Sequence, residues 1–218
     1  MSLITCVDDL RRLHKRRVPK MFYDYSESGS WTESTFVRNE SVFNEILLRQ
    51  RVAVDLTNRS QSKEILGERW AMPVALAPTG MAGMQCSDGE IKAAQAAEEF
   101  GVPFTLSTMS ICSIEDVAEN TSKPFWFQLY VMKDRRFVES LIDRAKKANC
   151  SALVLTLDLQ ILGQRHKDIK NQLSAPPRLT IKNVVNMMTK PRWCMGMLAT
   201  RRHQFGNIVG HADGVDDL

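Results

Sequence analysis

The sequence lacks the features of several protein classes. Its 218 residues contain no run of about 18 apolar residues, which a membrane-spanning helix needs. No apolar stretch follows the charged N-terminal region, so no signal peptide is expected and the chain is placed on the cytoplasmic side. The five cysteines lie far apart with no C-x-x-C pair, and the four histidines show no metal-ligand spacing. Neither a disulfide framework nor a metal site is predicted.

Aromatic residues are also scarce, at 7% of the chain. Among the basic residues near the C-terminus only Trp193 and Phe205 are available to stack on bases, and no recognition motif accompanies them. Nucleic acid is therefore not an expected partner. The remaining composition, 44% hydrophobic and 25% charged, is that of an ordinary globular protein.

The net charge of +4 is unevenly distributed. Residues 165–202 contain nine lysines and arginines against one acid, Asp168, so this segment carries +8 and the rest of the chain −4. Apolar and aromatic residues are interspersed with these charges: Met187, Met188, Trp193, Met195, Met197 and Leu198. This pattern is typical of a segment that lies on an anionic membrane surface. The alternative is a solvated loop.

Residues 1–72 are predicted to form a helical cap region, with a helix that stops near Pro19 and another over Asn44–Leu48. From residue 73 the pattern alternates between short apolar strands and amphipathic helices. The strands are predicted at 74–77, 104–107, 125–131 and 152–157. Of the helices between them, the first ends at Phe100, the second begins after Ser113 and the third spans 137–147. A capping box is expected at 87–90, and Thr5-Cys6-Val7-Asp8 has a similar spacing before the first helix. Residues 113–116 are expected to open a helix.

Strands that are apolar throughout indicate a parallel sheet that is covered on both faces or closed into a barrel. Four strand–helix units make half of an eight-unit barrel, which takes about 250 residues. No G-x-G-x-x-G follows the first strand, so a dinucleotide-binding open sheet is not supported. The chain is either a small open α/β protein or the front half of a larger barrel.

Functional groups of a parallel barrel come from the carboxyl ends of its strands and the loops that follow. The residues at these positions are Pro78, Thr79, Gly80, Ser107, Thr108, Gln128, Tyr130, Thr156, Asp158 and, in the next loop, Arg165. Small hydroxyls and an amide suit the edge of a flat heteroaromatic ring, and an arginine can clamp a carboxylate through two bonds. Taken singly, these residues also fit turns, a helix cap or a solvated charge.

Several motifs in these positions resemble the FMN-dependent family that oxidises 2-hydroxy acids. They are Phe22-Tyr23-Asp24-Tyr25, Ala77-Pro78-Thr79-Gly80, Leu106-Ser107-Thr108, Phe127-Gln128-Leu129-Tyr130, Leu155-Thr156-Leu157-Asp158 and Leu162-Gly163-Gln164-Arg165 with Asp168. They follow the family's order over nearly the whole chain. Pro191-Arg192-Trp193 and Phe205-Gly206-Asn207 resemble the bacterial membrane-associated lactate dehydrogenases of that family.

The resemblance implies a (β/α)8 TIM barrel, of which this chain holds the cap and about four units, and FMN as cofactor. Ser107, Gln128 and Thr156 match side chains that bond the flavin, and the backbone of Pro78, Thr79 and Gly80 lies along it. The residues that bind the substrate in this family correspond to Tyr25, Tyr130 and Arg165. Asp158 matches the carboxylate that orients a catalytic histidine.

That histidine, and the phosphate-binding groups of the family, belong to strands five to eight and are not among these residues. His166 and His203 do not match a strand end. We therefore expect residues 73–163 to be the first half of an FMN-binding barrel and 164–218 a basic loop after strand four. The isolated chain is expected to be inactive.

By this resemblance the expected activity is the oxidation of L-lactate to pyruvate. Gly80 stands where oxidases of the family often have alanine, which favours a quinone or respiratory-chain acceptor. The protein is expected to bind the cytoplasmic side of the inner membrane peripherally, and to form a homo-oligomer at full length. The alternatives are a glycolate-type oxidase that uses oxygen, and a non-catalytic fragment that binds only a membrane or a partner.

Overall fold

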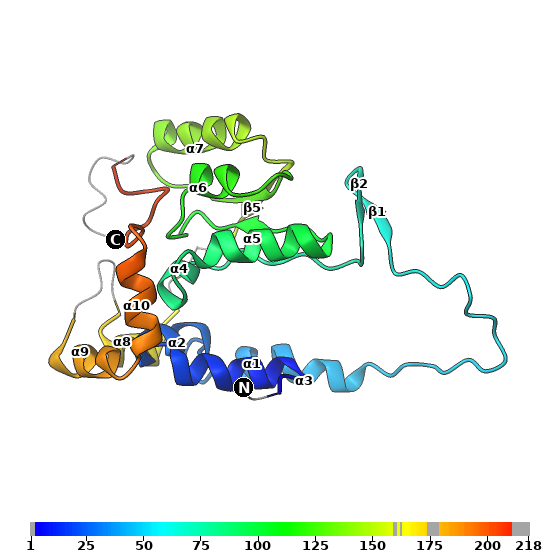
Figure 1. The fold of residues 1–218 in the computed structure, drawn as a ribbon, viewed down its shortest axis with the longest axis horizontal. Helices are drawn as coiled ribbons and strands as arrows, with labels where there is room; N and C mark the ends of the chain where they lie inside the picture. Colours follow the sequence, from blue (N-terminus) through cyan, green and yellow to red (C-terminus); the bar gives the residue numbers. More distant parts are fainter. Residues whose placement is uncertain (1–2, 159–160, 162, 174–178, 211–218) are drawn as a thin grey trace.

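The computed structural model describes residues 3–158, 161, 163–173 and 179–210. Two structural parts meet in it: a group of helices from both ends of the chain, and a small parallel sheet with helices packed against it (Figure 1). Leu162 of the Gly163 motif, and residues 174–178 and 211–218 of the predicted basic loop, lie outside the described residues.

The sheet contains three parallel strands in the order β3 (Thr105–Leu106), β4 (Trp126–Tyr130) and β5 (Ala152–Thr156). Parallel strands need a crossover, and helices supply it in each case. The predicted strands at 104–107, 125–131 and 152–157 are therefore confirmed, each one or two residues shorter than expected at its ends. In the register, Gln128 lies opposite Val154 and Tyr130 opposite Thr156.

The first predicted strand, 74–77, forms only one parallel bridge, between Leu76 and Phe104. Pro73 and Pro78 flank it and have no N–H to donate. The segment has no strand partner on its other side within the described residues, so nothing extends the bridge into a ladder. The prediction was right about position and direction but wrong about a full strand.

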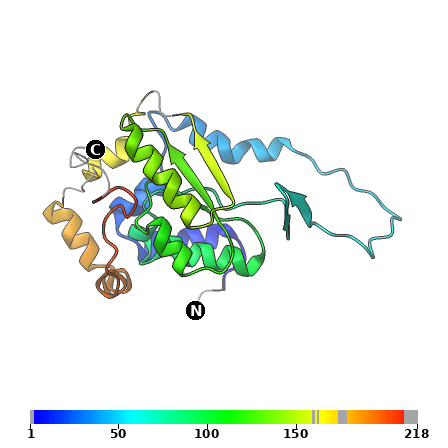
Figure 2. The ribbon, with the colours of Figure 1, turned by 90° about the horizontal axis from the view of Figure 1, so that it is seen from above.

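Helices α5 (Gly89–Phe100), α6 (Ile114–Glu119) and α7 (Arg135–Lys147) pack beside the sheet (Figure 2). Their apolar faces and the inward residues of β3 and β4 make the main core, which includes Leu106, Ile114, Val117, Phe127 and Leu141. Helix α6 begins after Ser113 as predicted, and a capping box forms there: the Ser113 hydroxyl accepts from Asp116 N, and the Asp116 carboxylate accepts from Ser113 N. The similar spacing at Thr5 does not form a box, because Cys6 is the N-cap of the first helix and makes no side-chain cap bond.

The predicted box at 87–90 does not form. Asp88, not Ser87, precedes the helix, in the left-handed region with φ of 54°, and its carboxylate accepts from Thr200 and Arg202. Glu90 turns inward instead of capping. Tertiary contacts with residues far along the chain have replaced the local ones.

The N-terminal part contains α1 (Val7–Arg17), α2 (Lys20–Ser26), α3 (Ser34–Ser41) and the 3₁₀ turn η1 (Val42–Glu45). The helix that was predicted to stop near Pro19 is confirmed as α1. The prediction of a helix over Asn44–Leu48 is wrong, because only the 3₁₀ turn forms there. Leu47 and Leu48 are almost fully exposed, and a short amphipathic helix is not stable without a surface to pack on.

A β-hairpin joins this region to the sheet, and nothing in the sequence pattern predicted it. Strands β1 (Lys63–Ile65) and β2 (Glu68–Trp70) pair antiparallel through Leu66 and Gly67, both at positive φ. Such a pair of central residues matches the right-handed twist of a hairpin. Three-residue strands are too short to show an alternating pattern.

The last helices along the chain are α8 (His166–Asn171), α9 (Ile181–Met188) and α10 (Pro191–Ala199). They lie near the short helix α4 (Ala82–Gln85), which precedes α5 (Figure 1). Trp193 of α10 stacks on Phe22 of α2 at 5.7 Å and donates from Nε1 to Met84 O at 2.8 Å. These contacts bring the N-terminal and C-terminal regions together beside α4 (Figure 1). Within the described residues no helix is long and apolar enough to cross a membrane.

Candidate functional site

A line of polar side chains crosses the three strands at their carboxyl ends. Ser107 Oγ lies 3.3 Å from Gln128 Oε1, and Gln128 Nε2 donates to Thr156 Oγ1 at 2.8 Å. Gln128 is only 1% exposed, and its partners satisfy an amide that burial would otherwise penalise. The structure thus brings together the three side chains that the sequence placed on the flavin.

Thr108 belongs to the same cluster, and it was not among the predicted site residues. It is fully buried, its backbone N donates to Gln128 Oε1 at 3.1 Å, and its hydroxyl donates to Gln128 O at 2.6 Å. Tyr130 N in turn donates to the Thr108 hydroxyl. Thr108 was expected at the same strand end as Ser107, but the sequence analysis assigned it no contact with the flavin.

Pro78, Thr79 and Gly80 follow the bridge at Leu76, and the loop they form is held against the loop after β3. Met81 N donates to Met109 O at 3.0 Å. A Cβ added at Gly80 would lie 3.1 Å from the Tyr25 hydroxyl. Glycine therefore permits a close approach between this backbone and a tyrosine from α2. Pro78 and Thr79 are exposed, as backbone that faces a ligand must be.

Arg165 is joined to Tyr25 although 140 residues separate them. Its guanidinium donates to Tyr25 O and, at 3.1 Å, to Ser28 Oγ, and its carbon Cζ lies 4.8 Å from the centre of the Tyr25 ring. Asp168, one helical turn later, lies 2.6 Å from Arg165 Nε. This arrangement holds the arginine with its side chain one-third exposed, rather than free in solvent.

The two tyrosines and Asp158 occupy one neighbourhood. Burial raises the pKa of Tyr130, and the negative charge of Asp158 and the presence of Tyr25 raise it further. Burial also raises the pKa of Tyr25, which the Arg165 charge partly offsets. Both phenols therefore stay protonated near neutral pH and can donate a hydrogen bond.

Asp158 is exposed two residues beyond β5, and it does not cap a helix in the described part of the chain, since the next helix begins at His166. The His14 ring lies 5.2 Å from the Tyr23 ring at an interplanar angle of 58°, and burial lowers the pKa of its imidazole. His166 and His203 are exposed on other segments. None of these three histidines lies at a strand end.

Two buried polar residues behind the site were also missed by the sequence analysis. Asn207 is fully buried, and its Oδ1 accepts from Ile114 N at 2.9 Å while its Nδ2 donates to Ser110 Oγ at 3.0 Å. Glu90 Oε1 accepts from Gly83 N at 2.9 Å and from Ile111 N at 3.0 Å. Neither Glu90, in the first turn of a helix, nor Asn207, in a turn after α10, shows in the sequence that its side chain is buried.

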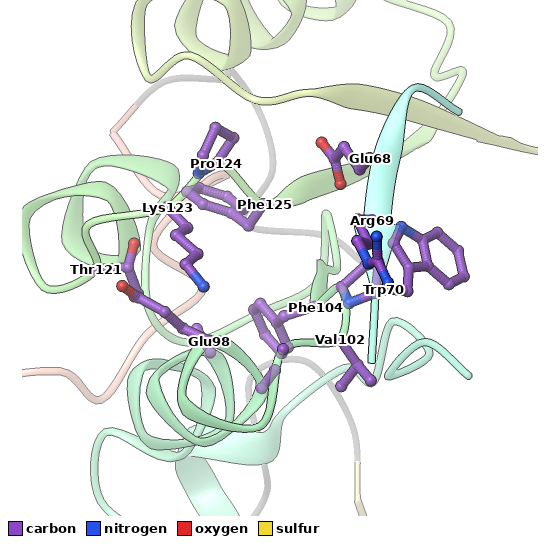
Figure 3. Close-up of a pocket in the computed structure, with 14 residues that line it drawn as sticks. Glu68, Arg69, Trp70, Glu98, Val102, Phe104, Thr121, Lys123, Pro124 and Phe125 are labelled. Carbon is purple, nitrogen blue, oxygen red and sulfur yellow. The ribbon is translucent and has the colours of Figure 1, made fainter. Parts of the chain in front are cut away.

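A separate hollow of about 420 Å³ lies at the amino ends of the strands. Figure 3 shows it between β2 on one side and the side chains of Glu98 and Lys123 on the other, with Phe104 and Phe125 in its wall. It is at the opposite end of the sheet from the polar line. No group of three or more His, Cys, Asp or Glu residues placed to hold a metal occurs among the residues that the structure describes.

Comparison with known families identifies the family of the chain. A family described as FMN-dependent dehydrogenase matches residues 14–215. The chain belongs to the FMN-dependent dehydrogenase family. The predicted family is thereby confirmed, and with it the barrel class of the fold, of which the structure holds an open part.

The chain is similar to bacterial L-lactate dehydrogenases, among them those of Haemophilus influenzae and Vibrio parahaemolyticus. That of Haemophilus influenzae (strain PittEE) is 43% identical over 219 residues, which cover 99% of this chain and 57% of that protein. That of Vibrio parahaemolyticus serotype O3:K6 is 42% identical over 207 residues, covering 94% and 54%.

A solved structure described as the monotopic membrane protein (S)-mandelate dehydrogenase superposes with a TM-score of 0.88 at 35% identity. The match covers 96% of this chain and 56% of that one. The chain therefore spans little more than half the length of the proteins it matches.

Proposed function

We propose that these residues are part of an enzyme that oxidises an L-2-hydroxy acid with FMN, and that its substrate is L-lactate. The observation that carries this proposal is the line Ser107–Gln128–Thr156 at the carboxyl ends of adjacent strands, in a chain of the FMN-dependent dehydrogenase family. The choice of lactate is supported by the two L-lactate dehydrogenases that share more than 40% of its residues.

The residues present fit a flavin. The polar line is neutral and offers both donors and acceptors, as the edge of a heteroaromatic ring requires, and the exposed loop at Pro78–Gly80 presents backbone beside it. Ser107, Gln128 and Thr156 would hold the ring by its edge, and the Gly80 backbone would lie along it. When bound, FMN supplies an acceptor for the two electrons that leave the substrate carbon.

The substrate carboxylate would bind Arg165. Its guanidinium is already oriented by Tyr25 O and Ser28 Oγ, so little side-chain freedom is lost when an anion binds. The protonated hydroxyls of Tyr25 and Tyr130 would donate to substrate oxygens. Asp158, whose charge reaches Tyr130, would orient the histidine that accepts the α-proton, as the family resemblance implies.

We also propose peripheral attachment to the cytoplasmic side of the inner membrane through residues 165–202, transfer of electrons to a quinone, and a homo-oligomer for the whole protein. The membrane attachment is supported by the monotopic (S)-mandelate dehydrogenase and by the exposed apolar side chains of α9 and α10. The choice of a quinone as electron acceptor is supported by Gly80, because the family resemblance implies that oxidases often have alanine at this position.

The test uses the whole protein and the 218-residue chain side by side. L-lactate with a quinone-like dye should be turned over by the whole protein, and neither glycolate with oxygen nor lactate with oxygen should match that rate. The 218-residue chain should not bleach flavin with lactate, since the proton acceptor is not among its residues. Faster turnover with glycolate and oxygen would support the oxidase instead, and no turnover at all would support a non-catalytic role.

A substitution tests the assignment of Arg165. In the whole protein, Arg165→Met should raise KM for lactate at least about tenfold, because a charge-assisted contact to a carboxylate contributes about 1.5–3 kcal/mol. The matched control is Arg192→Met, an exposed arginine of α10, which should leave KM unchanged. An unchanged KM in Arg165→Met would remove its substrate role.

A further inference from the structure

A basic hollow of about 510 Å³ lies beside the N-terminal helices, away from the polar line across the strands. Helices α1 and α2 form most of its wall, and the segments that begin α8 and α10 complete it (Figure 1). Five of the nine lining residues are cationic and two are acidic. The nine are Arg11, Lys15, Val18, Lys20, Tyr23, Asp24, Glu27, Lys167 and Lys190.

Both acidic residues of the hollow already have cationic partners. Arg11 Nε lies 2.7 Å from Glu27 Oε2, and Lys20 pairs with Asp24 one turn along α2. Lys167 Nζ lies 3.0 Å from Glu33 Oε1, which is outside the lining, so a formal excess of two positive charges remains within the described residues. Such an excess, in a concave wall, concentrates anions near the surface.

Two of the lysines are free of carboxylate partners in the described residues. Lys15 Nζ lies 6.0 Å from the centre of the Tyr23 ring. Lys190 Nζ donates to Lys15 O at 3.3 Å and to Arg16 O at 2.8 Å, so it is held at the last turn of α1. An ammonium group keeps a third proton for another acceptor. The hollow thus has donors in place for an anion.

Helix α9, which contacts α2, carries exposed apolar residues. Ile181, Val185 and Met188 are 86%, 56% and 73% exposed, and Met188 lies two residues before Lys190. Lys20 N donates to Asn186 Oδ1 at 2.7 Å, which joins α9 directly to the wall formed by α2. An amphiphile with an anionic head and apolar chains matches both features, whereas a free phosphate would use only the cations.

We propose that this hollow binds the phosphate of an anionic phospholipid headgroup, with the apolar residues of α9 against the acyl region. The inference rests on the proposed attachment to a membrane and goes further, because it assigns one site and includes α1, which lies outside the basic segment at 165–202. Lys15 and Lys190 are the residues expected to contact the phosphate.

The experiment measures sedimentation of the 218-residue chain with vesicles of phosphatidylcholine alone and with phosphatidylglycerol added. The variant is Lys15→Gln with Lys190→Gln. The control is Lys170→Gln with Lys182→Gln, which removes the same charge from exposed positions of α8 and α9. The expected result is binding that needs phosphatidylglycerol, a loss of at least about tenfold in the variant, and a much smaller loss in the control.

Equal losses in the two pairs would mean diffuse attraction and overturn the site, while membrane attachment would stand. No binding of the original chain to either vesicle would overturn both. Glycerol phosphate is the soluble probe. If it shifts the amide signals of α1 while vesicle binding does not depend on Lys15 and Lys190, the lipid assignment is wrong. Because Lys190 holds the end of α1, Lys15→Gln alone is measured as well, with circular dichroism to check folding.

Discussion

Asn207 Nδ2 donates a hydrogen bond to the Ser107 carbonyl oxygen at 3.3 Å, across 100 residues of sequence. The same side chain accepts from Ile114 N, and Arg144 donates to its backbone and side-chain oxygens. The segment after α10 therefore supports the loop that follows β3 from behind. Asn207, near the C-terminal end of the described chain, thus helps to position Ser107.

Replacement of Asn207 by alanine should destabilise the fold by about 1–3 kcal/mol, because Ile114 N would remain buried without an acceptor. Urea unfolding measures the change, and hydrogen exchange should become faster at the Ile114 amide. Asn58→Ala, at an exposed loop position, is the matched control and should have little effect. Equal stability of the two variants would contradict the supporting role of Asn207.

Glu90 links helix α4 to the loop after β3 through a single carboxylate. Glu90→Ala should destabilise the protein by about 3 kcal/mol, since two buried N–H groups lose their acceptor. Glu90→Gln keeps one oxygen for both and should cost less than half as much. Thermal and urea unfolding compare them with Glu99→Ala, an exposed position on α5. The prediction fails if the alanine and glutamine variants are equally stable.

The pKa of Glu115 is lowered from 4.5 to about 2, chiefly by its hydrogen bonds to the Arg144 guanidinium. A carboxyl with a depressed pKa stabilises the fold above its ordinary pKa and loses this contribution as pH falls through the folded value. The window is therefore from about pH 5 down to about pH 2. The Glu115 side chain is 48% exposed, so solvent reduces the effect to about 1 kcal/mol.

Glu115→Gln should accordingly be less stable than the original chain at pH 6, and the difference should disappear as the pH approaches 2. Urea unfolding at a series of pH values measures it, with Glu119→Gln as an exposed control on the same helix. A difference that persists at the lowest pH would show that the ion pair does not cause it.

Strand β5 pairs with β4 on one side, and no strand of the described chain pairs with its other side. Leu153 and Leu155 lie opposite Phe127 and Leu129, which are buried, yet they are 47% and 51% exposed themselves. Unpaired apolar edges promote association between chains. The 218-residue chain should therefore self-associate with rising concentration.

Leu155→Lys should reduce this association, because a lysine on an edge strand opposes further pairing. Light scattering over a concentration series measures it. Leu47→Lys introduces the same charge at an exposed leucine outside any sheet and should leave the association unchanged. A monodisperse original chain would contradict the prediction.

Much of this architecture followed from local pattern. The apolar runs of β4 and β5, the amphipathic faces of α5 and α7 and the start of α6 after Ser113 all depend on residues close in sequence, and all were predicted. Polar residues at the ends of successive parallel strands were expected to meet, and Ser107, Gln128 and Thr156 do so. The family resemblance rested on these same residues.

Tertiary contacts decided the rest. Ser87 and Ser113 begin similar four-residue patterns, but only the second forms a capping box, because Asp88 is engaged by Thr200 and Arg202 and Glu90 by two backbone amides.

The sequence by itself determined strands β3, β4 and β5, helices α1, α5, α6 and α7, and the family to which the chain belongs, since period and spacing are local properties. Only the tertiary structure determined that Asn207 and Glu90 support the site and that Lys190 joins α1, since a hydrogen bond between distant segments depends on how they pack.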